Sequence, residues 1–170
     1  MFKKSFFKIS EMLSGKRQKK LYWMTYFAAE TIGNVVEQEI RSAKSWDEKI
    51  FADEQAYIMC FFVYLYFREK RPENFDELMN EFVRILEGFG KQKWLEGIKA
   101  YSEAWDKTVK QGRHFDGIQT VAYIRCFGEV KANEMWKSFI KTLTYNFKIT
   151  NLFEHIFGLL ENIEKSTSKS

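Results

Sequence analysis

The sequence predicts an all-α fold: a single-domain array of about seven to eight helices packed around a central apolar helix at 46–69. The chain has one proline in 170 residues, and proline is the residue that most strongly disrupts helix interiors. Capping signals mark helix starts, and apolar residues follow each signal at a spacing of three or four. No run alternates apolar and polar residues over five or six positions, so we expect no β-sheet.

Capping signals place the starts of four helices. Residues 45–48 read Ser-Trp-Asp-Glu, the form of a capping box in which the serine caps the helix and the glutamate returns a hydrogen bond. Looser versions, with Asn or Asp at the cap, occur at 74–77, 116–119 and 151–154. We expect a helix to begin at each of these four points.

Apolar stripes at helical spacing complete the set of elements. They open with Phe2 and Phe6, Leu21 and Met24, Phe75 and Leu78, Trp94 and Ile98, Ile118 and Val121, Trp136 and Phe139, and Leu152 and Ile156. With the central helix, the expected ranges in chain order are 2–13, 21–43, 46–69, 75–89, 94–109, 116–127, 136–147 and 152–163. Glycines close the fourth helix at 88 and 90 and the fifth at 112.

The central helix contains the run AYIMCFFVYLYF at 56–67, which has no charge and no amide. Twelve helical residues extend about 18 Å, whereas a bilayer core is about 30 Å thick, so the run is too short for a transmembrane span. A helix that is apolar all round is typical of the centre of a packed array. A dimer face and reversible membrane insertion stay open. Buried phenols need hydrogen-bond partners, so Tyr57, Tyr64 and Tyr66 will face core, cavity or interface.

Charge is concentrated at the N-terminus. The chain carries a net charge of +4, yet residues 1–20 hold seven basic side chains and one acidic one, so the remainder is close to neutral. We divide the chain into a basic amphipathic N-terminal helix at 1–15, a helical domain at 16–165 and a flexible tail at 166–170. We expect a cytoplasmic protein, because Lys8 and Glu11 interrupt the only segment that resembles a secretory signal.

The N-terminal arm, residues 1–15, is the one local functional signal. Phe2 and Phe6 share an apolar stripe with Ile9 and Leu13, and basic side chains lie off that stripe. The stripe is interpreted first as packing onto the domain with its lysines solvated. The alternative is that the arm contacts an acidic partner or a membrane surface, through Phe2, Lys3, Lys4, Phe6 and Lys8. Nucleic acid is not expected, because the rest of the chain lacks a basic face.

No pattern indicates a catalytic or metal site. The two histidines, His114 and His155, belong to no Glu-x-x-His pair, and Cys60 and Cys126 form no CxxC motif. Phosphate-binding loops and nucleophile elbows are also missing. We therefore expect no metal, no cofactor and no enzyme, while an active site assembled from residues distant in sequence stays open.

These exclusions leave two functions. The first is a non-enzymatic regulatory or protein-interaction domain that binds another protein, with self-association as a homodimer also open. The second is a sensor for an apolar small molecule, a fatty acid-like ligand more than haem, held in a cavity between helices. Its candidate lining residues, with Arg125 as the anchor for a carboxylate, are Phe61, Tyr64, Leu65, Trp94, Tyr101, Trp105 and Arg125.

Overall fold

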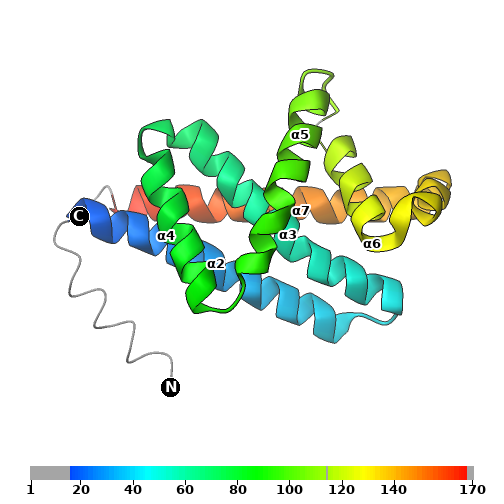
Figure 1. Cartoon of the computed structure of the whole chain (residues 1–170), viewed down its shortest axis with the longest axis horizontal. Helices are drawn as coiled ribbons and strands as arrows, with labels where there is room; N and C mark the ends of the chain where they lie inside the picture. Colours follow the sequence, from blue (N-terminus) through cyan, green and yellow to red (C-terminus); the bar gives the residue numbers. More distant parts are fainter. Residues whose placement is uncertain (1–15, 114, 168–170) are drawn as a thin grey trace.

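Helix α3 (Trp46–Lys70) runs through the middle of the molecule, and each of the other described elements packs against it (Figure 1). A computed structural model describes residues 16–113 and 115–167, and these residues form helices and no strand. The predicted all-α class is confirmed.

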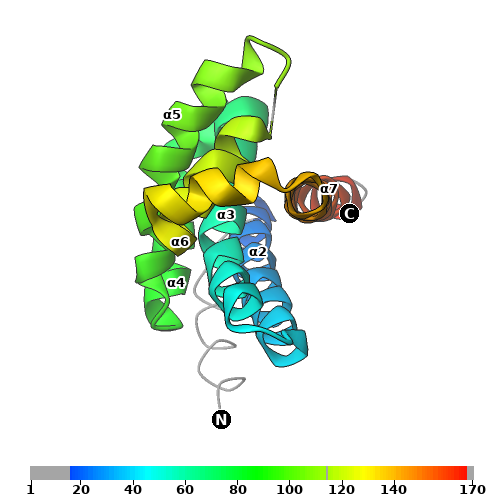
Figure 2. The ribbon, with the colours of Figure 1, turned by 90° about the vertical axis from the view of Figure 1, so that its right-hand side faces the viewer.

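Six α-helices and two short 3₁₀ helices make up the described part of the chain. In order they are α2 (Lys16–Ser42), α3, η1 (Pro72–Asn74), α4 (Phe75–Gly88), η2 (Gln92–Gly97), α5 (Ile98–Val109), α6 (Asp116–Lys137) and α7 (Phe139–Thr167). Figure 2 shows α2 and α3 side by side, with α4 and α5 on one side of them and α7 on the other. The expected helix at 2–13 lies outside the described residues.

The expected number of seven to eight helices is therefore too high for this part of the chain. The expected break before residue 152 does not occur, because Asn151 lies exposed within α7 and no cap forms there. The helix expected at 116–127 ends where Gly128 takes a non-helical conformation with a φ of 76°, and beyond this kink a second helical stretch of α6 runs on to Lys137. Trp94 lies in η2, and α5 begins only at Ile98.

Some of the predicted helix caps form in the structure and others do not. Ser45 caps α3 as predicted, since its Oγ accepts a hydrogen bond from the Glu48 amide at 3.2 Å. The Glu48 carboxylate accepts from the Lys44 amide at 2.6 Å, one residue earlier than a standard capping box. Asp116 does not cap α6: its carboxylate accepts from Arg113 Nε at 2.6 Å.

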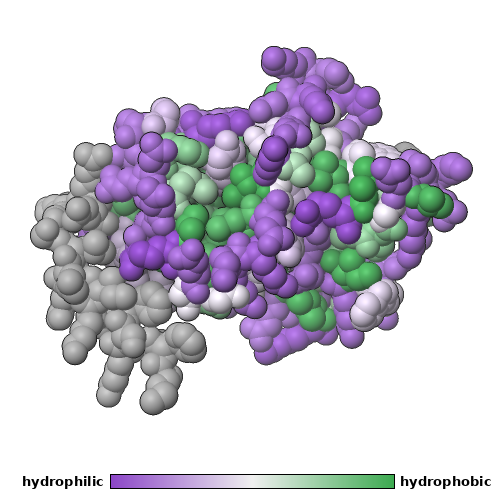
Figure 3. Space-filling view, in the orientation of Figure 1, coloured by the Kyte–Doolittle hydropathy of each residue, from purple (hydrophilic) through white to green (hydrophobic). Residues whose placement is uncertain are grey.

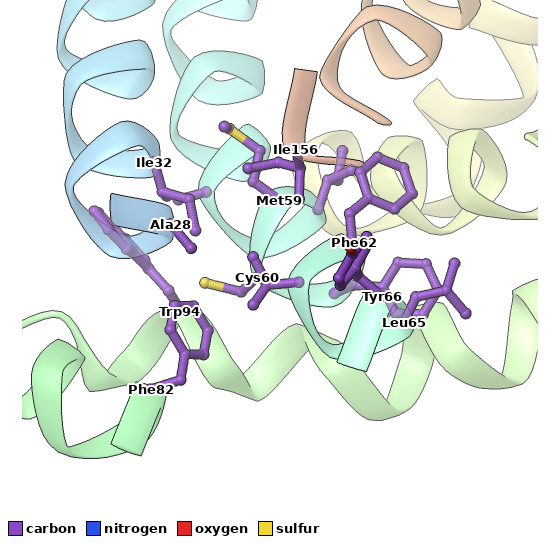
Figure 4. Packing of buried hydrophobic residues seen from close by; sticks show 14 of the residues in the cluster. Ala28, Ile32, Met59, Cys60, Phe62, Leu65, Tyr66, Phe82, Trp94 and Ile156 are labelled. Carbon is purple, nitrogen blue, oxygen red and sulfur yellow. The ribbon is translucent and has the colours of Figure 1, made fainter. Parts of the chain in front are cut away.

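Aromatic side chains of several helices meet around α3. The Phe62 ring lies 5.3 Å from that of Phe153 in α7, and the Trp105 ring of α5 stacks on Phe153 at 6.1 Å. Figure 4 shows the same core from close by, with Ala28 and Ile32 of α2 and Ile156 of α7 around the side chains of α3. The large aromatic content of the chain thus fills space between helices.

The α3 helix is long and apolar enough by composition to cross a membrane. Its most apolar 18-residue window is, however, 83% buried inside the fold. Both a membrane span and the core helix of a packed array have this composition, and the packing on every side is that of a core helix.

The three tyrosines of α3 contact neighbouring elements. Tyr66 is buried and packs edge-on against Phe157 of α7 at 5.1 Å, and its burial together with a hydrogen bond to Glu164 raises its pKa. Tyr57 lies under the Arg125 guanidinium at 4.8 Å. Tyr64 is half-buried and packs against Phe75 at 5.5 Å.

Gly117 sets how closely α5 and α6 approach each other. A Cβ at this position would lie 2.7 Å from the Ala104 carbonyl oxygen and 2.9 Å from Thr108 Oγ1. We expect Gly117→Ala to lower the free energy of unfolding by about 1–3 kcal/mol, because the two helices must move apart to admit the methyl group. Urea unfolding followed by circular dichroism measures this, and an unchanged midpoint would contradict it.

Candidate functional site

A groove of about 870 Å³ runs along α2, between that helix and the segment that joins α4 to η2. Its apolar lining comes from the side of α2 that faces this segment and from two aromatic residues across from it: Tyr26, Ala29, Gly33, Val36, Ile40, Phe89 and Trp94. The α2 positions from 26 to 40 are spaced three or four apart and cover about 21 Å of helix. Of this lining Ile40 is exposed, Tyr26, Gly33 and Phe89 are half-buried, and Ala29, Val36 and Trp94 are buried.

The local sequence explains the position of Phe89 and Trp94, which form the wall of the groove opposite α2. Helix α4 ends at Gly88, and Gly90 takes a left-handed φ of 67°, which glycine adopts without strain. The chain therefore turns sharply after α4. Phe89 is placed against Tyr26 of α2, with ring centroids 6.0 Å apart, and η2 brings Trp94 alongside.

Charged residues form the rim of the groove. Arg41 pairs with Glu37 on α2, and Lys91 Nζ lies 5.1 Å from the centre of the Trp94 ring. Glu30 and Asp53 also line the groove, and neither makes an ion pair with any described residue. These two carboxylates are therefore available to pair with basic groups of a bound molecule.

Trp94 carries a buried polar atom without a partner. Its side chain is 3% exposed, and its Nε1 has no hydrogen-bond acceptor within the described residues. A buried donor left unpaired costs about 1–3 kcal/mol. The atom is enclosed by protein, so a bound molecule reaches it only if the Trp94 side chain moves.

Away from the groove, a cluster of polar side chains lies in the core and connects α3, α5 and α6. Glu54 Oε1 accepts hydrogen bonds from Tyr101 Oη and Arg125 Nε, both at 2.5 Å. Burial outweighs these two bonds and raises the pKa of Glu54, and burial next to Glu54 raises the pKa of Tyr101. Because Glu54 and Tyr101 are buried, this cluster ties three helices together.

The residues predicted to line a ligand cavity are only partly brought together. Phe61, Leu65, Tyr101 and Trp105 are buried, and the Phe61 ring lies 6.0 Å from that of Tyr101 and 6.2 Å from that of Trp105. They fill the core together with the half-buried Tyr64, whose ring lies 6.4 Å from that of Phe61. Arg125 binds Glu54. Of the seven, Trp94 alone belongs to the lining of the groove.

The groove-lining residues that the sequence reasoning missed have one visible signal. Gly33 is a glycine in the interior of a predicted helix, where it weakens the helix relative to alanine. An added Cβ at Gly33 would meet nothing within 4 Å. A helix-interior glycine beside open space could have pointed to this site. The partner-surface residues Phe2, Lys3, Lys4, Phe6 and Lys8 lie outside the described residues.

The described residues were also compared with what a metal site needs. Within residues 16–113 and 115–167, no three His, Cys, Asp or Glu side chains come together as a metal site requires. Cys60 and Cys126 are both free, and burial raises the pKa of each thiol.

Comparison of the chain with models of protein families, with curated proteins and with solved structures gives no match. The shape of the groove, its apolar lining and the charge of its rim are therefore the features from which a function can be inferred.

Proposed function

We propose that this protein is a non-enzymatic interaction domain that binds an amphipathic helix of a partner protein in the groove along α2. The observation that carries the proposal is the apolar lining of the groove, which follows α2 for about 21 Å, the length of fourteen helical residues. Grooves of this kind bind a helix through apolar residues at i, i+3, i+4 and i+7. The lining offers Tyr26, Ala29, Gly33, Val36 and Ile40 at the matching spacing.

The rim indicates the chemistry of the partner. Glu30 and Asp53 are exposed and lack ion-pair partners among the described residues. A partner helix that places lysine or arginine beside its apolar stripe would pair with both. An acidic helix would instead bring like charges together, which disfavours binding.

Two synthetic peptides test the proposal. One is a 14-residue amphipathic peptide of leucine and lysine, and the other carries glutamate in place of every lysine. We expect the leucine–lysine peptide to bind the full chain about tenfold more tightly, since two rim ion pairs of about 0.7 kcal/mol each amount to 1.4 kcal/mol. Fluorescence anisotropy of the labelled peptides measures both affinities. If neither peptide binds, the proposal is overturned.

A second candidate function is favoured by Trp94. The groove volume of about 870 Å³ falls in the range of small-molecule sites, roughly 300–1,000 Å³, and the unpartnered Nε1 of Trp94 would donate to a carboxylate or carbonyl oxygen. An apolar ligand with one such acceptor, for example a fatty acid, would pair with this atom once the Trp94 side chain turned toward the groove. Displacement of the leucine–lysine peptide by palmitate would support this function. A peptide affinity that palmitate does not change would contradict it.

A further inference from the structure

The end of the molecule where α6 is followed by α7 carries four of the five large apolar side chains that are more than half exposed among the described residues. We call residues 129–147 the tip: it comprises the stretch of α6 beyond its kink and the first turns of α7. Ile140 is 77% exposed, Leu143 53% and Phe147 67%, all on α7, and Val130 on α6 is 79% exposed. Figure 3 shows apolar surface at this end, at the right of the view.

The three apolar residues of α7 lie on one side of their helix, away from the side that packs on the fold. Ile140, Leu143 and Phe147, which we call the α7 stripe, are three and four residues apart, the spacing of one coiled-coil seam. Tyr145, on the other side of the helix, packs against the Phe51 ring of α3 at 4.3 Å. A surface helix needs only one apolar side to pack on its domain. The second apolar side is therefore free to contact another molecule.

We propose that a second copy of this chain covers the tip, in a two-fold symmetric dimer whose two α7 stripes pack against each other. With the axis near Leu143, Ile140 of one copy lies against Phe147 of the other, and symmetry repeats this contact on the far side of the axis. The stripe is centred on Leu143, with its other members three and four positions away, so the same short surface is complementary to itself. This interaction goes beyond the proposed binding of a helix in the groove along α2 and does not depend on it.

The charges around the stripe favour a second copy over other partners. Lys137 and Lys141 are exposed, as are Glu129 and Glu134, and none of the four makes an ion pair with any described residue. An anionic membrane surface or an acidic partner protein would attract the lysines but repel the glutamates. A second copy presents both signs of charge, and two-fold symmetry forms each lysine–glutamate contact twice.

The size of the stripe sets the strength that we expect of the dimer. Apolar side chains of this size present roughly 100–150 Å² each at these exposed fractions, or about 300–450 Å² per copy. Weak and transient protein interfaces bury less than about 1,200 Å² in total over both partners. The stripe and the polar residues around it fall in this class, so we expect a dissociation constant of about 10–100 μM.

Sedimentation velocity of the full chain tests the proposal. Between about 1 and 300 μM we expect the unmodified chain to change from one copy to mostly two. Leu143→Glu places a charge at the centre of the stripe and should raise the dissociation constant at least about tenfold. Its helix content, measured by circular dichroism, should stay the same because this side chain is exposed. Phe27→Glu is the matched control: Phe27 is 38% exposed on α2 and lies outside the tip, so this change should leave the dissociation constant as it is.

Two charge variants of the tip test whether the dimer can be regained. One combines Lys137→Glu with Lys141→Glu, and the other combines Glu129→Lys with Glu134→Lys. Each variant alone brings like charges together across the interface, so we expect its dissociation constant to rise at least about tenfold. An equimolar mixture brings opposite charges together and should restore the dimer, more strongly at low salt than at high salt.

Four results would overturn the proposal. The first is a chain that stays monomeric up to about 300 μM, and the second is an equal effect of Leu143→Glu and Phe27→Glu. The third is a mixture of the charge variants that dimerises no better than either alone. The fourth is a monomeric chain that binds phosphatidylserine vesicles and loses this binding in Leu143→Glu, which would assign the tip to a membrane surface. Since the groove lies on α2, the leucine–lysine peptide should bind Leu143→Glu and the unmodified chain equally, so the two proposals can fail separately.

Discussion

Replacing Glu54 with alanine is expected to lower the free energy of unfolding by about 3 kcal/mol, the largest loss that we expect from a single polar substitution in this chain. The carboxylate accepts hydrogen bonds from Tyr101 and Arg125 and so connects α3 to α5 and α6. Tyr101 is 0% exposed, so its hydroxyl would be left unpaired in the core. Arg125 is less affected, because its side chain is 30% exposed and can be hydrated.

Two variants separate the hydrogen bond from the charge. Glu54→Gln keeps an acceptor for Tyr101 and should recover most of the loss, since burial already disfavours the ionised form of Glu54 by raising its pKa. Asp53→Ala removes the neighbouring carboxylate, which is exposed, and should change stability by no more than about 0.5 kcal/mol. Urea unfolding measures all three variants. A loss below about 1 kcal/mol in Glu54→Ala would contradict the structural role of this cluster.

The sequence was sufficient to predict the fold class because the signals for helices are local. Ser45 caps α3 with its own side chain, and the apolar run that follows is buried as its composition indicates. Asn151 shows the limit of such signals. Asparagine is favourable at a cap but also acceptable on an exposed helix face, and only the packing of α7 on its neighbours decides between the two.

The candidate site was harder to predict, because cavities depend on how helices are placed in space. Phe61, Tyr101 and Trp105 have the side chains expected of an apolar pocket, and in the structure all three are buried, with the Phe61 ring 6.0 Å from that of Tyr101 and 6.2 Å from that of Trp105. The groove is instead built where the turn at Gly90 holds Phe89 and Trp94 opposite α2. Residues about 60 positions apart in the chain form its two walls, and no periodicity within one helix encodes that distance.

Filling the groove from within should abolish partner binding without harming the fold. Gly33 lies midway along the groove, and a side chain added there would meet nothing within 4 Å. We expect Gly33→Leu to raise the free energy of unfolding by about 0.5–1 kcal/mol, because leucine favours the helix more than glycine does. The same side chain occupies the space that a partner helix needs, so the leucine–lysine peptide should bind at least about tenfold more weakly.

Gly158 provides the matched control for this change. It is also a helix-interior glycine, in α7, with nothing within 4 Å of an added Cβ, and it does not belong to the groove. Gly158→Leu should therefore give a similar gain in stability while leaving peptide affinity unchanged. Equal peptide binding by Gly33→Leu and the unmodified chain would show that the peptide binds elsewhere. A stabilised protein that has lost peptide binding only in Gly33→Leu would assign the binding site to the groove, because misfolding cannot produce that pair of results.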